Sequence, residues 1–226
     1  MAPQSTAAVP YEGNRFSAEV ARIIDATPMI PVLTFKDEEE AVAVSRALVA
    51  GGIKVLEVTL RTEAGLRSIA AIAEAVPGAI VGAGTLLAPS HFGAALEAGA
   101  HFAVSPGHTP RLLDAAEESG LPYLPAAGSP SEVMGLLERG YTRQKLFPAE
   151  PLGGIPLLKG MADPIPYVRF CPTGGIDIQK APAYLALANV ACVGGSWVVP
   201  KDAIVARDMG RIEKLAREAA ALRPAA

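Results

Sequence analysis

Two ionisable residues of this chain lie inside short apolar segments, where charged side chains are uncommon. Glu57 lies within KVLEVTLRT and Lys145 within QKLFPAE, and both segments have the composition of buried strands. A lysine that is removed from water loses its proton more easily, and the neutral amine attacks a ketone to give a carbinolamine and then an imine. That chemistry needs a nearby acid or base, and Glu57 is the available candidate. The pair therefore predicts covalent catalysis on a keto compound through Lys145.

Both residues also have a structural interpretation. Side chains alternate along a strand, so Glu57, Thr59 and Arg61 share one face and the intervening apolar residues share the other. A buried carboxylate must be paired, and an ion pair with Arg61 would satisfy Glu57 without any catalytic role. Lys145 can likewise extend its ammonium into water from the start of its strand. We favour catalysis because each of the two residues supplies what the other one needs.

Two glycine clusters follow the last two predicted strands. They are CPTGGI, with Thr173, Gly174 and Gly175, and VGGSW, with Gly195 and Ser196. Loops after the seventh and eighth strands of (β/α)8 barrels commonly hold a phosphate, because glycines let backbone N–H groups approach the anion. Ordinary turn glycines are the alternative, but two clusters at these two strands favour a phosphate site.

Two further positions lie where strands are predicted to end. In IVGAGT, small glycines precede Thr85, which falls at the carboxyl end of its strand, where substrate contacts gather. In VSPG, Pro106 ends the next strand and would wall a small apolar pocket. Tight strand packing and strand termination are the corresponding structural alternatives.

The elements that must position these residues alternate along the chain. Short apolar or β-branched runs recur at intervals of roughly 20 to 25 residues, and amphipathic helical stretches separate them, which is typical of βα units with parallel strands. The predicted strands cover residues 29–35, 54–60, 79–85, 101–106, 122–127, 144–149, 167–174 and 190–196. These eight strands in a short chain predict an α/β fold, a (β/α)8 TIM barrel, with a doubly wound open sheet as the alternative.

The ends of the chain complete this organisation. Residues 1–15 are rich in proline, serine and alanine and are expected to form a mobile tail, and residues 16–226 are expected to form a single barrel domain. SAEVARIIDATP predicts an extra helix ahead of the first strand that would close the bottom of the barrel, and RIEKLAREAAAL predicts a final helix.

Composition excludes several classes of protein. The 226 residues carry a net charge of -3, which argues against a nucleic-acid partner. No signal peptide and no apolar run of roughly 18 residues is present, so we expect a cytoplasmic protein without a membrane partner. Cys171 and Cys192 lie in apolar runs and are expected to be reduced core residues. The three histidines lack metal-site spacing, so no metal is predicted.

Taken together, LEVTLRT, IVGAGT, FAVSPG, KLFPAE, RFCPTGG and VGGSW resemble, in order and spacing, the class I 2-keto-3-deoxy-6-phosphogluconate (KDPG) and 4-hydroxy-2-oxoglutarate (KHG) aldolase family. The resemblance runs from about residue 20 to the end of the chain. It implies a homotrimer of (β/α)8 barrels that splits KDPG into pyruvate and glyceraldehyde 3-phosphate in the Entner-Doudoroff pathway. It also implies that no metal or organic cofactor is required.

The resemblance assigns roles to individual residues. Lys145 of KLFPAE would form the Schiff base, and Glu57 of LEVTLRT would be the general acid/base. Arg61 and Thr85 would hold the pyruvyl carboxylate, and the keto-acid site is completed by Thr173 and Pro106. The phosphate would be bound by the two glycine clusters, at Gly174, Gly175, Gly195 and Ser196. One segment departs from the family pattern: PAAGSPSE follows the fifth strand where relatives carry a sequence such as PGxxT, which bears on aldehyde preference.

Three other functions stay open at this point. The same chemistry can act on KHG or on the galactonate-derived epimer of KDPG. A phosphosugar isomerase or epimerase would share the barrel and the phosphate loops but would need no imine-forming lysine. A catalytically silent phosphosugar-binding or structural trimer is the third, and the presence of both Glu57 and Lys145 argues against it.

Overall fold

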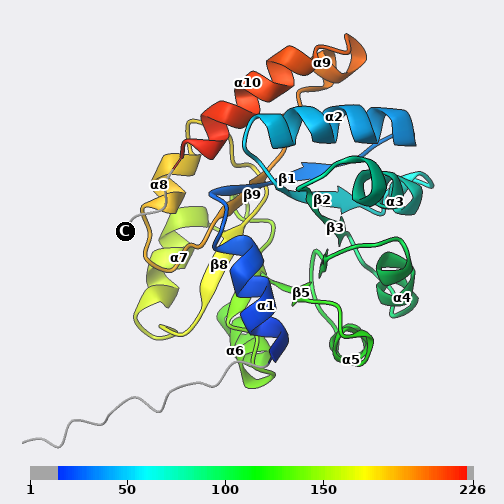
Figure 1. Cartoon of the computed structure of the whole chain (residues 1–226). Coiled ribbons are helices and arrows are strands. Elements are labelled where there is room, and N and C mark those ends of the chain that lie inside the picture. The colour runs from blue at the N-terminus through cyan, green and yellow to red at the C-terminus, as the bar shows by residue number, and fades with distance from the viewer. Residues whose placement is uncertain (1–14, 223–226) are drawn as a thin grey trace, which may run out of the picture.

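The computed structural model describes residues 15–222, in which helices and strands alternate along the chain (Figure 1). The predicted mobile tail at residues 1–15 lies outside the described part, except for Arg15, which is the first residue of α1. The strands are β1 (Met29–Leu33), β2 (Val55–Thr59), β3 (Ile80–Gly84), β4 (Phe102–Val104), β5 (Tyr123–Leu124), β6 (Ala126–Ala127), β7 (Arg143–Leu146), β8 (Arg169–Pro172) and β9 (Val193–Gly195). The helices are α1 (Arg15–Ile24), α2 (Glu38–Ala50), α3 (Gly65–Ala75), α4 (Ser90–Glu97), α5 (Pro110–Ser119), α6 (Pro130–Glu138), α7 (Gly154–Ala162), α8 (Ala181–Leu185), α9 (Lys201–Val205) and α10 (Met209–Ala220).

Every predicted strand segment overlaps a strand, although β7 begins one residue before the predicted segment 144–149. The fifth predicted strand is interrupted at Pro125, which separates β5 from β6 because proline has no N–H group for the ladder. The carbonyl of Pro125 still accepts a hydrogen bond from the Lys145 N–H at 2.9 Å, so the segment keeps contact with β7. The predicted extra helix and the predicted final helix are present as α1 and α10.

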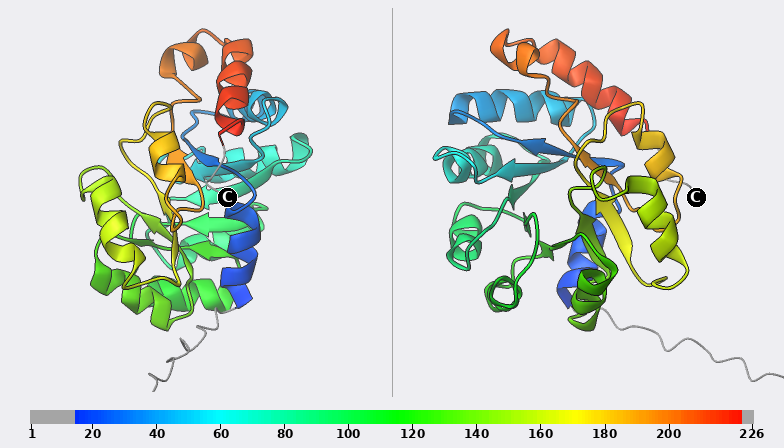
Figure 2. Two further views of the ribbon diagram at one scale, coloured as in Figure 1. Left: turned by 90° about the vertical axis from the view of Figure 1, so that its left-hand side faces the viewer. Right: turned by 180° about the vertical axis from the view of Figure 1, so that it is seen from behind.

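All strand pairs within the sheets are parallel, which confirms the α/β fold with parallel strands. The strands pair as a six-stranded sheet, in the order β5-β4-β3-β2-β1-β9, and a three-stranded sheet, in the order β6-β7-β8. Two isolated parallel bridges, Phe170 to Val190 and Thr173 to Gly194, link the segments around β8 and β9. This pairing defines two sheets rather than one closed eight-stranded ring. In Figure 2 most helices lie outside the strands.

Buried residues divide into two clusters according to strand face. Leu56 and Val58 of β2 belong to the larger cluster, between strands and outer helices. Val55 belongs to a smaller cluster with Val20 and Ile24 of α1 and with inward-facing side chains from other strands. Helix α1 therefore covers the amino ends of the strands. The face that carries Val55 also carries Glu57, so alternation directs this carboxylate inward as predicted.

Local signals explain why helices begin where the strands end. The Asp37 carboxylate caps α2 by accepting a hydrogen bond from the Glu40 N–H at 2.8 Å, and Thr109 and Ser129 cap α5 and α6 in the same way. Gly120 ends α5 in the left-handed conformation that glycine adopts at little cost. The loops before these helices are thereby held at the carboxyl ends of the strands, where the predicted site residues lie.

Candidate active site

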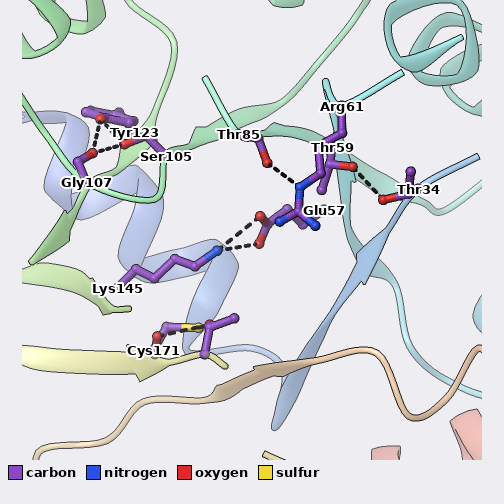
Figure 3. A network of polar contacts seen from close by, with 11 residues as sticks. Thr34, Glu57, Thr59, Arg61, Thr85, Ser105, Gly107, Tyr123, Lys145 and Cys171 are labelled. Atoms are coloured by element: carbon purple, nitrogen blue, oxygen red, sulfur yellow. Dashed lines mark hydrogen bonds and ion pairs between the residues drawn. The ribbon is translucent and has the colours of Figure 1, made fainter. Parts of the chain in front are cut away.

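Lys145 and Glu57 meet inside the molecule, although 88 positions separate them in the sequence. The Lys145 Nζ donates hydrogen bonds to Glu57 Oε1 at 3.1 Å and to Oε2 at 3.3 Å (Figure 3). The two residues are 5% and 4% exposed. Strand β7 presents Lys145 inward, whereas its neighbour Gln144 turns to the helix side and donates to the carbonyls of Val133 and Tyr141.

The structural alternative for Glu57, an ion pair with Arg61, is wrong. The cation that pairs with Glu57 is Lys145, and Arg61 donates its Nε hydrogen bond to Thr85 Oγ1 at 3.3 Å instead. Lys145 does not extend into water either, because its side chain is only 6% exposed. The Coulomb attraction within a buried ion pair offsets only part of the free energy needed to remove both charges from water. A contribution to stability is therefore a weak explanation for this pair. An amine and a carboxylate in direct contact can also exchange a proton, which is what acid–base chemistry requires.

The surroundings of Lys145 are apolar on one side and contain sulfur on another. The Phe147 ring lies under the ammonium, with 5.5 Å between Nζ and the ring centroid. Cys171 projects from β8 into the inner cluster, and its pKa is lowered first by a hydrogen bond with Cys192 and then by the charge of Lys145. Both cysteines are free and buried, which confirms the prediction of reduced core residues.

Thr85 has an unusual backbone conformation. Its φ angle is +63°, in the left-handed region that a β-branched residue seldom enters. Such strain usually persists where the surrounding structure imposes it, and it is concentrated at functional sites. Here it brings the Thr85 hydroxyl to Arg61, which extends from the end of β2. A second hydroxyl pair, Thr34 with Thr59 at 2.7 Å, joins the ends of β1 and β2 beside it.

A cleft of about 380 Å³ opens at the carboxyl ends of the strands. It brings together most of the predicted site residues: Arg61, Lys145, Thr173, Gly174, Gly175, Gly195 and Ser196. Gly174 and Gly175 have φ angles of +107° and +81°, which only glycine adopts readily. The Thr173 side chain packs against Gly194, where any Cβ atom would collide with the threonine hydroxyl. The glycines of these clusters thus serve close packing and a special backbone at once.

Pro106 lies elsewhere. It lines a separate hollow of about 300 Å³ with Gly107 and residues 126–129 and 132 of the PAAGSPSE loop. Phe147 borders both the hollow and the main cleft. Glu57 and Thr85 do not line the main cleft themselves, but each is hydrogen-bonded to a residue that does.

The sequence interpretation missed several residues of the cleft. Thr34 and Phe35 lie at the end of β1, and the same rule that singled out Thr85 at the end of β3 would have found them. Phe147 follows Lys145 by two positions and shares its strand face, which was a usable signal. Lys201 begins the short helix α9 and lines the cleft beyond Ser196, and nothing in its local sequence indicated this position.

Comparison with known proteins identifies the relatives of this chain. The family model "KDPG and KHG aldolase" matches residues 20–215. The chain belongs to this aldolase family. It is 52% identical over 197 residues to the KHG/KDPG aldolase of Escherichia coli K12, covering 87% of this chain and 92% of the relative. It is 50% identical over 194 residues to the 2-dehydro-3-deoxy-phosphogluconate aldolase of Pseudoalteromonas atlantica, covering 86% of this chain and 90% of that one.

The fold of this aldolase is also similar to two solved structures. The KDPG aldolase of Zymomonas mobilis ZM4 with 3-phosphoglycerate superposes with a TM-score of 0.87 at 46% identity, covering 91% of this chain and 97% of the other. The KDPG aldolase of Legionella pneumophila, with pyruvate captured as a covalent carbinolamine intermediate, gives a TM-score of 0.86 at 44% identity, covering 89% and 98%. The family predicted from the sequence blocks is therefore confirmed. Within residues 15–222 of this aldolase, no helix has the length and apolar character to span a bilayer.

Proposed function

We propose that this aldolase cleaves KDPG to pyruvate and glyceraldehyde 3-phosphate through a Schiff base on Lys145. The observation that carries the proposal is the buried contact of 3.1 Å between Lys145 Nζ and Glu57 Oε1 at a cleft large enough for a sugar acid. The carbinolamine intermediate in the Legionella relative supports the same covalent chemistry.

Glu57 accepts and donates the protons that the reaction transfers. It accepts a proton from the Lys145 ammonium, and the neutral amine adds to the C2 ketone of the substrate. Glu57 returns this proton to the C2 oxygen, which gives the carbinolamine. It then carries a second proton from the Lys145 nitrogen to the C2 hydroxyl, which leaves as water and gives a protonated imine. Glu57, directly or through a water, next takes the proton of the C4 hydroxyl. The C3–C4 bond breaks, its electrons pass to C3 as an enamine, and the aldehyde is released. Protonation of C3 and addition of water to the imine release pyruvate and free Lys145.

The two ends of the cleft orient the substrate. Arg61, supported by Thr85, would bind the carboxylate next to the reacting ketone, and Thr173 would border the keto acid. The glycine clusters would bind the phosphate through backbone N–H groups and the Ser196 hydroxyl. Binding energy from both anionic ends would then hold the C3–C4 bond in line with Lys145 and Glu57. The imine supplies the electron sink, so the proposed mechanism uses no metal or organic cofactor.

The proposal includes the finer architecture. The bridges between β8 and β9, together with the continuity of β5 and β6, support closure of the two sheets into one (β/α)8 barrel within a single domain of residues 16–226. We propose a homotrimer of such barrels on the resemblance to the family. The predicted cytoplasmic location stays a prediction from the N-terminal sequence, which lies outside the described residues.

A second substrate, KHG, is favoured by one observation. The Escherichia coli relative carries the name of both activities. KHG ends in a carboxylate instead of a phosphate, so the same cleft would hold an anion at each end. Comparing cleavage of the two acids by the purified protein measures which one it prefers.

The decisive experiment for the proposed function is to trap the imine. We would incubate the protein with pyruvate and borohydride and locate the added mass by peptide mapping, with Lys145→Arg as the matched control. A reduced pyruvate adduct on Lys145, absent from the control, is the expected result. No adduct at saturating pyruvate, with activity retained by the control, would overturn the proposal in favour of an isomerase or epimerase.

A further inference from the structure

Lys201 lines the cleft but has no role in the chemistry described above. The backbone turns back after β9, where the Val199 N–H donates to the Ser196 carbonyl at 3.1 Å, and Lys201 follows at the first position of α9. Ser196 and Lys201 therefore border the same part of the cleft.

The Lys201 ammonium has no counter-charge. Among residues 15–222, its side chain has neither a hydrogen-bond acceptor nor an ion-pair partner. The adjacent carboxylate, Asp202, pairs with Arg211 at 2.6 Å instead. Another lysine near the glycine clusters, Lys180, is taken up by Glu150 at 2.6 Å. Lys201 is thus a cation at the cleft that is available to an external anion.

The cationic side chains that line the cleft come from different strands. Apart from Lys145, the cleft is lined by two cationic side chains, Arg61 and Lys201, among the described residues. Arg61 follows β2 and Lys201 follows β9, and β1 lies between these two strands in the sheet. A linear acid with an anionic group at each end therefore has a separate cation of the cleft available to each group.

We infer that Lys201 is a specificity-determining residue that binds the terminal anion of the substrate and favours phosphorylated over unphosphorylated keto acids. The inference deepens the proposed function and rests on it. The predicted phosphate set, Gly174, Gly175, Gly195 and Ser196, supplies only uncharged donors, whereas a phosphate ester carries nearly two negative charges at neutral pH. Lys201 supplies the charge that this set lacks. Because Lys201 is exposed, its effect is modest and sensitive to salt.

The test compares Lys201→Ala with the wild type on KDPG and on the same acid without its phosphate, 2-keto-3-deoxygluconate. The ratio of the two kcat/KM values is expected to fall about fivefold, mainly through a higher KM for KDPG. Lys201→Arg should restore most of the ratio. Lys214→Ala removes an equal charge from α10, away from the cleft, and should leave the ratio as in the wild type. In the wild type, the ratio should decrease as salt is added.

A binding measurement separates this inference from the proposed function. Titration with 3-phosphoglycerate, and with glycerate as the reference, reports the phosphate contact without any cleavage. Weaker 3-phosphoglycerate binding in Lys201→Ala, with glycerate binding changed by less than about twofold, supports the role of Lys201 even in a protein that cleaves no KDPG. Equal 3-phosphoglycerate affinity in the two proteins, or an equal loss for both ligands, overturns it even if the imine is trapped on Lys145.

Discussion

Gly84 of β3 and Glu57 of β2 are so close that Gly84 has no room for a side chain. A Cβ atom at Gly84 would lie 2.5 Å from Glu57 Oε1 and 2.6 Å from Glu57 Cγ. The position of the Glu57 carboxylate therefore leaves room only for glycine at residue 84.

Substituting this glycine tests whether activity depends on that position. Gly84→Ala should displace the Glu57 carboxylate and lower kcat/KM for KDPG by about a hundredfold, since a misplacement of 1 Å can cost that much. Gly93→Ala is the control, because nothing lies within 4 Å of its Cβ position in α4. Full activity in Gly84→Ala, measured beside this control, would show that Glu57 does not need its present position.

Glu57→Gln separates proton transfer from packing. Glutamine keeps the shape of the side chain but accepts no proton, so kcat should fall by roughly 10² to 10⁴. Borohydride trapping of pyruvate should still label Lys145, at a lower rate than in the wild type. The measurement is a time course of adduct mass beside steady-state kinetics, and an unchanged kcat would remove Glu57 from the mechanism.

The buried pair also makes a prediction about stability. Lys145→Met leaves the Glu57 carboxylate buried and unpaired, which should lower the free energy of unfolding by about 3 to 5 kcal/mol at neutral pH. The double variant Lys145→Met/Glu57→Gln removes both charges and should regain a large part of that loss. Urea unfolding of these two variants and of Glu57→Gln completes the double-mutant cycle, and the pair is not coupled if the losses of the two single variants add up to the loss of the double variant.

The loop after β6 makes a prediction about pH. The Gly128 N–H donates to Glu132 Oε2 at 2.7 Å, and this bond, joined by one from Ser129, holds the pKa of Glu132 below its ordinary value of 4.5. A lowered pKa stabilises the fold above pH 4.5, and this contribution disappears as the pH falls through the folded-state value. Because Glu132 is exposed and solvent screens its interactions, Glu132→Ala should cost no more than about 0.5 kcal/mol at pH 7 and less at pH 3.

The control for this prediction is Glu138→Ala at the other end of α6, whose removal takes away no helix cap. Urea midpoints for both variants at the two pH values supply the comparison. A cost for Glu132→Ala that stays constant with pH would mean that the neutral side chain caps the helix equally well.

Strand periodicity was sufficient to predict that Glu57 and Lys145 are buried inside the molecule. Alternation directed Glu57 inward, and the strand position of Lys145 removed it from water, so both could be identified before their contact was known. Alternation does not report which inward cation is nearest, and the predicted alternative partner, Arg61, turned to Thr85 instead. That choice depends on the left-handed backbone of Thr85, which the sequence does not reveal.

Positions outside the strands were harder to predict. Pro106 was expected to wall a pocket because it ends a strand, and it lines the hollow beside the main cleft, with Phe147 bordering both. Lys201 was missed because its distance from the cleft depends on how the chain turns after Ser196. The break between β5 and β6 could have been inferred from Pro125, because proline has no N–H group to donate to the neighbouring strand.

Helix α1 affects the order in which substrates bind and products leave. The amino ends of the strands are filled by Val20 and Ile24 together with the inward side chains that they contact. Substrates therefore reach Lys145 through the cleft at the carboxyl ends of the strands. In the proposed mechanism pyruvate is bound covalently to Lys145 at the inner end of the cleft, so the aldehyde lies between it and solvent and must leave first. In the synthetic direction pyruvate must load before the aldehyde. Helix α1, at the end of the molecule opposite the cleft, would thereby make substrate binding and product release ordered.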